Sequence, residues 1–205
     1  MVEIPDSLVE RLKERQVVLV AGLGCSELAG APGWNELTEA LAGRLVFSDA
    51  RQVVARLTAA GRMNDAIAFI RDLVPHQLVE EAFAHAYPEG RTVPDAMTAC
   101  ARFPWRAVVT TAFDDLWERA LDAADGGRRP ATVLTAGDDP MQAQSSGLPL
   151  LQIAGRVALP ESLCLGPGDA RVRLVPSAGL AWLAHMARRR SLVFVGFRPT
   201  DPDLV

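Results

Sequence analysis

The chain has 205 residues, 49% of them hydrophobic and 22% charged, which is ordinary for a globular protein and long enough for one α/β domain. The net charge of -4 gives no basis for binding nucleic acid or an anionic membrane surface. The three cysteines are scattered without a Cys-x-x-Cys spacing, which excludes a structural zinc ribbon and argues against a disulfide framework. The sequence has neither a signal-peptide apolar region nor an apolar run of the roughly 20 residues that a membrane span needs, so we expect a cytoplasmic protein.

The first 45 residues predict a helix, a strand, a glycine turn and a second helix. IPDSLVERLKERQ offers an N-cap at Asp6 or Ser7, followed by apolar residues at helical spacing. VVLVAG (17–22) is a short β-branched run that ends in glycine, which is typical of a strand buried on both faces of a parallel sheet. GWNELTEALAGRL predicts a helix over about 35–45.

Residues 49–101 predict helices only, with breaks at Gly61 and Pro75. This block is too long for a loop in a compact domain, so we expect a helical insert. The remaining elements are then a strand in WRAVVTT, a helix in DLWERALDAA, a turn in GGRRP, strands in ATVLTAG and LPLLQIAG, a helix in SAGLAWLAHMARRR and a strand in SLVFVGF.

The alternation of strands and helices predicts an α/β, Rossmann-like domain with a doubly wound parallel sheet and helices on both faces. Residues 1–205 form a single domain in this interpretation. The chain stops eight residues after the last predicted strand, which ends at residue 197. We therefore expect it to be the N-terminal part of a longer, multidomain protein.

The glycine turn after the first strand is the most informative segment. Gly22 and Gly24 allow a tight turn whose backbone N–H groups can face a phosphate at a helix N-terminus. The third glycine of the dinucleotide fingerprint is missing, so the turn alone fits a purely structural role too. Cys25 lies in this turn, where a lowered thiol pKa is one interpretation and a small residue tolerated in a tight place is the favoured one.

Four segments together resemble prokaryotic sirtuin-like domains, the family named for silent information regulator two. They are IPDSLVERLKERQVVLVAGLGCSELAGAPGWNELTEAL, FPWRAVVTTAFDDLWERAL, LPLLQIAGRVALPESLCLG and RSLVFVGFRPTDPDL, in the family's order and spacing. The resemblance spans essentially the whole chain, including the insert. It implies a Rossmann-like domain that binds NAD under a smaller helical part. Stand-alone members deacylate lysine with NAD, and the bacterial relatives this chain most resembles often hydrolyse NAD in antiphage defence, fused to sensing or repeat domains.

The resemblance also implies which residues would bind the nucleotide. The family's Gly-Ala-Gly-x-Ser motif corresponds to residues 22–26, where Leu23 replaces alanine and adds three heavy atoms at the phosphate turn. The candidate NAD or ADP-ribose-binding residues are Gly22, Gly24, Cys25, Ser26, Trp34 of the Pro-x-Trp motif, Thr110, Thr111, Asp114, Gly155, Gly196 and Arg198. No residue is implied for zinc, because the zinc module of the deacylases is not present.

Both catalytic positions of the family hold alanine here. Ala112 stands where the family has the asparagine that orients water or the ribose, and Ala154 stands where it has the histidine that acts as general base. Alanine has neither a donor nor an acceptor, and loss of a general base alone typically costs about 10²–10⁴-fold in rate. Alanine is also the residue that an experimenter would introduce to inactivate an enzyme. Leu23 argues against such an engineered variant, because inactivation would not require a change at that position.

Other groups offer weaker alternatives. His76, His85 and His185 lie in predicted helices, where we expect surface or packing roles. Asp114 and Asp115 could act as a base in principle, but capping of the following helix explains them more simply. Arg198 could pair with a phosphate or with Asp201 or Asp203.

The sequence therefore predicts a catalytically inactive sirtuin-like domain. Its first-ranked role is a scaffold or protein-interaction module, with another protein, a further domain of the same protein or a second copy as partner. A sensor that binds NAD or ADP-ribose without turnover is the alternative, and an active NAD hydrolase of the defence type ranks third.

Overall fold

The computed structural model describes residues 4–126, 129–143, 147–198 and 201–202. The strands are β1 (Val17–Ala21), β2 (Ala107–Thr110), β3 (Ala131–Thr135), β4 (Leu148–Gln152) and β5 (Ser191–Val195). The helices are α1 (Asp6–Lys13), α2 (Gly24–Glu27), α3 (Trp34–Ala42), α4 (Ser48–Ala59), α5 (Met63–Leu73), α6 (His76–Ala86), α7 (Asp95–Ala101), α8 (Leu116–Asp125), α9 (Pro140–Ala143), α10 (Gly166–Asp169) and α11 (Ala178–Ala187). A 3₁₀ turn (Pro160–Ser162) and a π-helical turn (Ala170–Leu174) complete the described elements.

All five strands lie in one parallel sheet, in the order β3-β4-β2-β1-β5. Val18 of β1 is aligned with Ala107 of β2 on one side and with Leu192 of β5 on the other. The predicted parallel α/β, Rossmann-like architecture is therefore confirmed, because the apolar runs that lack alternation are the buried central strands.

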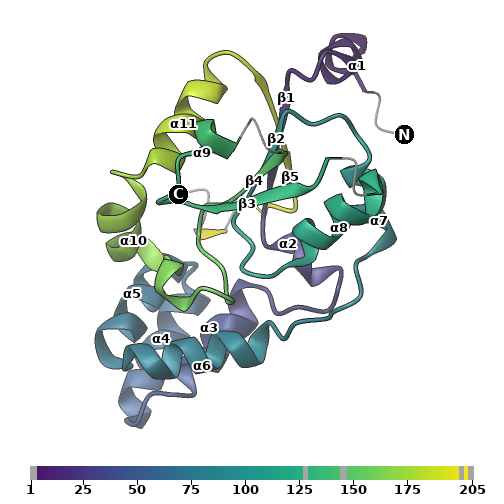
Figure 1. The fold of residues 1–205 in the computed structure, drawn as a ribbon. Helices are drawn as coiled ribbons and strands as arrows, with labels where there is room; N and C mark the ends of the chain where they lie inside the picture. The colour runs from purple at the N-terminus through teal and green to yellow at the C-terminus, as the bar shows by residue number, and fades with distance from the viewer. Residues whose placement is uncertain (1–3, 127–128, 144–146, 199–200, 203–205) are drawn as a thin grey trace.

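Helices cover both faces of this sheet (Figure 1). On one face, Val17 and Leu19 of β1 belong to a buried cluster that includes Trp117 of α8 and residues of α7. On the other face, Val18 and Val20 pack in the cluster of Trp182 and Met186 from α11. Successive strand residues thus serve opposite helical layers, as a doubly wound sheet requires.

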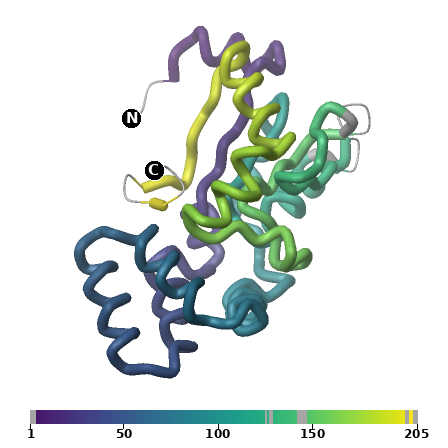
Figure 2. The backbone as a smooth tube through the Cα atoms, turned by 90° about the vertical axis from the view of Figure 1, so that its left-hand side faces the viewer, coloured from purple at the N-terminus to yellow at the C-terminus, as the bar shows by residue number. Residues whose placement is uncertain are grey.

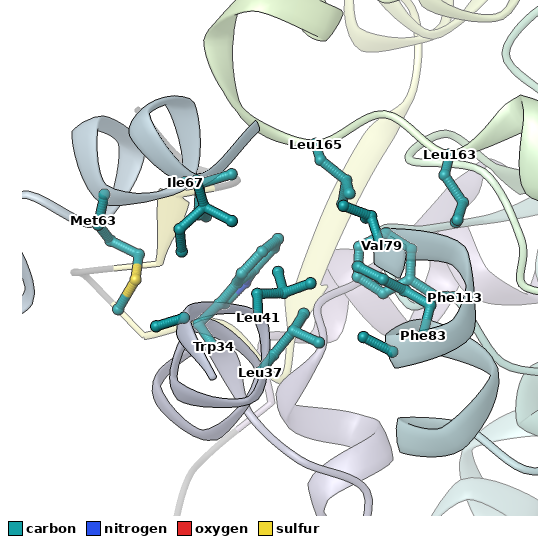
Figure 3. Close-up of a cluster of buried hydrophobic side chains, with 14 of the residues drawn as sticks. Trp34, Leu37, Leu41, Met63, Ile67, Val79, Phe83, Phe113, Leu163 and Leu165 are labelled. Atoms are coloured by element: carbon teal, nitrogen blue, oxygen red, sulfur yellow. The ribbon is translucent and has the colours of Figure 1, made fainter. Parts of the chain in front are cut away.

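The helical insert is confirmed between β1 and β2. Figure 2 shows its blue helices as a group below the sheet, with β1 and β5 side by side above them. Helices α3, α5 and α6 share their own buried cluster with the loops that follow β2 and β4. Figure 3 shows Trp34, Leu37 and Leu41 of α3 facing Ile67 and Met63 of α5 within that cluster.

Phe113 links this insert to the sheet. It follows β2 and is 1% exposed. Its ring lies edge-on to those of Phe83 and Trp34, with centroids 4.9 and 5.9 Å apart, and it also contacts Tyr87 at 5.7 Å. Edge-to-face pairs of this kind are a favoured aromatic geometry. The insert is therefore held against the carboxyl ends of the strands.

The short elements are where the sequence analysis was incomplete. Residues 24–27, expected as part of a turn, form α2, and α9, α10 and the π-helical turn were not anticipated. Each has only four or five residues, which is too short to display a helical period. No helix in the described ranges has the length and apolar character to cross a membrane.

Candidate functional site

A cavity of about 300 Å³ lies at the carboxyl ends of the strands, where the resemblance places the nucleotide. Strand and loop residues form one wall, α11 forms the second, and α10 with the π-helical turn forms the third. The lining residues are Val20, Trp34, Asn64, Val109, Thr111, Ile153, Ala154, Cys164, Gly166, Pro167, Ala170, Leu174, Leu180, Leu183, Phe194, Phe197 and Pro202. None of these described residues carries a charge, and most are hydrocarbon in character.

The two alanines lie in the same buried cluster at the ends of neighbouring strands. Ala112 follows β2 and is completely buried, and Ala154 follows β4 and is 9% exposed. Only Ala154 lines the cavity. The ends of β2 and β4 are therefore brought together as expected, but what they present at these two positions is methyl groups.

Gln152, which the sequence analysis did not single out, fixes this pair of strand ends. It is the last residue of β4 and is 2% exposed. Its side-chain Nε2 donates to the carbonyl oxygen of Asp114 at 2.6 Å and reaches that of Ala112 at 3.5 Å. The available signal was a polar residue at the end of an apolar strand, because buried polar side chains usually make hydrogen bonds, as the Gln152 nitrogen does although its Oε1 has no partner.

The glycine turn packs directly against the end of β5. Gly22 donates its N–H to the carbonyl oxygen of Val195 at 2.8 Å, and Gly24 donates to that of Gly196 at 2.9 Å. A Cβ atom at Gly22 or Gly24 would lie 2.5 or 2.7 Å from the Gly196 oxygen, closer than real Cβ contacts. At Gly196, whose φ is +69°, it would meet the Cys25 sulfur at 2.5 Å. Close packing alone therefore explains why these three positions hold glycine, without a bound ligand.

Leu23 does not crowd the turn in the way we expected. Its side chain is 1% exposed and belongs to the buried cluster of the helical insert. It is also absent from the residues that line the cavity. The backbone is helical at Leu23 (φ -59°, ψ -27°), and the side chain packs in the cluster that α3 shares with α5 and α6. The strand end of β5, not this leucine, occupies the space beside the turn.

Cys25 is an unreactive thiol in this setting. Burial raises its pKa to about 12, with smaller contributions from Cys100 and Asp114. A lowered pKa, one of the two sequence interpretations, is therefore contradicted, and the small buried residue is confirmed. The neighbouring Ser26 is also fully buried.

Thr110, the last residue of β2, and Thr111, which follows it, have different surroundings. Thr110 is 1% exposed, and its Oγ1 accepts the N–H of Ala112 at 3.0 Å. Thr111 lines the cavity, and its buried Oγ1 makes no hydrogen bond. Of the residues predicted to bind a nucleotide, only Trp34 and Thr111 line this cavity.

Asp114 accepts from the start of the helix that follows, as the capping interpretation predicted, whereas Asp115, at the N-cap position of α8, makes no side-chain capping hydrogen bond. Its Oδ1 accepts the N–H of Leu116, the first residue of α8, at 3.2 Å. Burial raises the pKa of the carboxyl, and the Leu116 N–H and the Ser26 hydroxyl oppose that rise. Ser26 favours the charged form by proximity only, because its Oγ makes no hydrogen bond of normal geometry.

Arg198 and Gly155 have local partners. The Arg198 guanidinium pairs with Glu27 of α2, and only its backbone N–H reaches the Asp201 carboxylate, at 2.7 Å. The alternative ion pair with Asp201 is thus wrong, and Asp203 lies outside the described residues. Gly155 has φ +90°, and a Cβ there would lie 2.3 Å from the Ser162 carbonyl oxygen.

A second cavity of about 500 Å³ lies on the other side of the segment after β2. Asp114, Asp115, Glu118 and Asp122 line it together with Arg119 and Arg156. Glu89 lines it as well, and two of its five carboxylates are paired, because Arg156 contacts Glu118 at 3.1 Å and Arg119 contacts Asp115 at 3.6 Å. The carboxylates of Glu89, Asp114 and Asp122 have no ion pair among the described residues.

The histidines stand apart from both cavities. His76 and His85 are exposed on α6 and His185 is exposed on α11, and none lines either cavity. Within the described ranges, no three His, Cys, Asp or Glu side chains come together as metal ligands. The cavity beside Ala154 is therefore the candidate site, and its walls supply packing and neutral hydrogen-bonding groups.

Residues 106–205 match the family model described as SIR2-like domain. No curated protein shows significant similarity to the chain. The match supports a sirtuin-like domain. It covers the last two of the four segments that carry the resemblance and the second from residue 106 onward, including both alanine positions. The glycine turn at residues 22–26 lies outside the matched range.

Proposed function

We propose that this sirtuin-like domain is catalytically silent and acts by binding, as a scaffold or interaction module. The observation that carries the proposal is the pair of buried alanines, Ala112 and Ala154, at the two strand ends. Neither methyl group can orient water or accept a proton. The described lining of the cavity contains no histidine, aspartate, glutamate or lysine that could replace the missing base.

The packing around these alanines supports the same proposal. Ala112 is completely enclosed among the aromatic and aliphatic side chains of the insert cluster. A water molecule held there would need two or more polar partners. The neighbouring Gln152 donates its amide nitrogen to the backbone, and its buried Oε1 is the one side-chain atom it leaves without a partner.

An interaction role is supported by two adjacent apolar residues just before the helical insert. Val46 and Phe47, between α3 and α4, are 84% and 74% exposed. Sedimentation velocity over a concentration series tests self-association through this loop. We expect larger species for the wild-type chain and their loss in Phe47→Glu, and a wild-type chain that stays monomeric throughout would contradict this route.

Catalysis is tested by following NAD with proton NMR over one day. We expect no nicotinamide release above the rate without protein. The double variant Ala112→Asn/Ala154→His restores the two side chains that the resemblance implies, and gain of NAD hydrolysis there would show that the rest of the site is competent. Nicotinamide release by the wild-type chain, in proportion to protein concentration, would overturn the proposal.

A further inference from the structure

We propose that the amino-terminal edge of the sheet, opposite the candidate site, is a docking surface for an acidic peptide segment of a partner protein. The segment places one apolar side chain in a small cavity at this edge, and its aspartate or glutamate side chains pair with the arginines around that cavity. This second site goes beyond the proposed function, because it does not depend on whether the domain turns over NAD.

Arginines gather at the amino ends of the strands. An arginine stands directly before a strand or two residues before it in four cases, namely Arg15 before β1, Arg106 before β2, Arg129 before β3 and Arg190 before β5. Because the five strands are parallel and lie in one sheet, their amino ends meet at one edge. The fold therefore concentrates positive charge at this edge of a chain whose net charge is -4.

A cavity of about 150 Å³ lies among these strand starts. Arg15, Arg102 and Arg129 line it, and its described lining contains no aspartate or glutamate. The other walls are apolar and come from the last residue of α7, from α8, from the segment before β2 and from the first residue of β4. The cavity thus combines an apolar interior with an arginine rim.

Phe103 and Trp105 form the aromatic part of this cavity. Phe103 is 48% exposed, and its ring lies against that of Trp105 with the centroids 5.9 Å apart. Trp105 is 4% exposed, and its Nε1 donates to the carbonyl oxygen of Cys100 at 2.8 Å, which fixes the indole. Aromatic residues and arginine are the residues that protein–protein interfaces enrich, with an apolar centre inside a polar rim.

The arginines at the rim carry charge that is available to a partner. Arg15 and Arg102 are exposed, and in the described ranges neither side chain makes an ion pair. Arg129 donates to the carbonyl oxygen of Gly147 at 3.4 Å, which holds its guanidinium beside the cavity. A guanidinium binds a carboxylate through two parallel N–H groups. A segment rich in aspartate and glutamate is therefore complementary to this rim.

A nucleic acid suits the surface less well than a peptide does. The negative net charge of the chain repels a long polyanion, whereas a short peptide brings few charges and meets the arginines locally. The cavity also has room for one side chain, and not for the row of stacked bases that single-stranded nucleic acids present.

Three matched peptides test the proposal with the full chain and without NAD. They are GEDLDEG, its neutral counterpart GQNLNQG and GEDGDEG, which lacks the apolar side chain, each labelled with fluorescein and followed by fluorescence anisotropy. We expect GEDLDEG to bind, GQNLNQG to bind at least about tenfold more weakly and GEDGDEG to bind severalfold more weakly. Raising the salt concentration from about 50 mM to about 500 mM should weaken GEDLDEG at least about fivefold, because salt screens exposed ion pairs.

Charge reversal locates the rim. Arg15→Glu/Arg102→Glu should abolish binding of GEDLDEG. Arg44→Glu/Arg56→Glu changes the net charge equally at two exposed arginines outside the cavity lining, and it should leave binding unchanged.

A further variant tests the apolar interior. Phe103→Ser should reduce the affinity for GEDLDEG to that for GEDGDEG and leave GEDGDEG unaffected. This pattern separates a lost apolar contact from a disturbed fold, which would weaken both peptides.

Several results would overturn the inference. They are no binding of GEDLDEG, equal binding of the acidic and neutral peptides, and binding that survives Arg15→Glu/Arg102→Glu or is lost equally in Arg44→Glu/Arg56→Glu. Tighter binding of a single-stranded oligonucleotide of about ten nucleotides would assign the surface to nucleic acid. Oligomers that dissociate in Arg15→Glu/Arg102→Glu would assign it to a second copy. Nicotinamide release would instead reject the silent domain and leave the docking surface standing, so the two failures are distinguishable.

Discussion

The N–H of Gly24 is donated to the carbonyl oxygen of Gly196 over 2.9 Å, which joins the turn after the first strand to the end of the last strand. A Cβ at position 24 would lie 2.7 Å from that oxygen, and backbone cannot move aside cheaply. The contact makes glycine at position 24 a structural requirement.

Gly24→Ala should therefore lower the free energy of unfolding by about 1–3 kcal/mol, the usual cost of overpacking. Gly137→Ala is the matched control, because nothing lies within 4 Å of a Cβ there, and it should change stability by no more than about 0.5 kcal/mol. Urea unfolding followed by circular dichroism measures both. Equal stability of the two variants would contradict the packing role of the turn.

Phe113 should be among the most stabilising side chains of the chain. Phe113→Ala removes a ring that touches three other aromatic rings across the junction of sheet and insert, and we expect a loss of about 3–5 kcal/mol. Phe47→Ala deletes the same ring from a position that is 74% exposed, with an expected effect within about 0.5 kcal/mol. Chemical denaturation of both variants checks the contrast, and a small effect at Phe113 would show that the insert is held by other contacts.

The two alanine positions should differ in how they tolerate larger side chains. Ala112 is completely enclosed, so Ala112→Asn inserts a bulky amide into a filled core and should cost about 1–3 kcal/mol. Ala154 borders the cavity, so Ala154→His can extend into free space and should cost less. Melting temperatures of the two single variants test this order, which would be contradicted if Ala154→His were the more destabilised.

Asp114 should make stability depend on pH in the acidic range. Its pKa is raised in the folded state by burial, so below the unfolded value of about 3.9 the carboxyl is neutral in both states and its stabilising contribution is complete. That contribution is lost as the pH rises through the folded pKa, because the unfolded chain ionises first. Asp114→Asn stays neutral and keeps an oxygen for the Leu116 N–H, so its melting temperature should rise relative to wild type more at pH 7 than at pH 4. If Asp114→Asn lost more stability at pH 7 than at pH 4, the ionised carboxylate would be favourably paired, contrary to the direction of its pKa.

Cys25 should resist alkylation while the chain is folded. A thiol whose pKa is about 12 holds roughly a thousandth of the thiolate of an ordinary cysteine at pH 8, because the pKa values differ by about three units. Iodoacetamide labelling read by peptide mass spectrometry should therefore modify Cys25 about 10³-fold more slowly in buffer than in urea. Similar rates in both would mean that the turn opens readily.

The fold was predictable from the sequence to a large extent, because its signals are local. The runs around Val18, Val108 and Leu150 contain almost no polar residue, and that composition arises only where both faces of a strand are covered. The insert displayed its helical period over many turns. Short elements such as α10 have no period to display, and the cavity wall that they form was accordingly missed.

The sequence predicted which residues lie at the strand ends of the candidate site. It did not predict how the side chains around the site pack. Motif comparison identified Ala112 and Ala154. These two residues lie close together because they follow β2 and β4, which are neighbours in the sheet. Motif comparison could not show that Leu23 points into the core or that Arg198 pairs with Glu27. Side-chain direction and pairing depend on contacts between segments far apart in the chain, such as Arg198 and Glu27, which are 171 residues apart. Sequence patterns do not contain that information.

Strand β5, whose end packs against the glycine turn, is also an edge strand of the sheet. In the described part of the chain, β5 hydrogen-bonds to β1 alone, and its Phe194 is 55% exposed. Edge strands with few covering contacts open at lower free energy than the centre of a sheet. The Gly24 amide should then exchange its hydrogen with solvent at the rate at which the edge breathes, and this single amide reports when the end of the sheet is open.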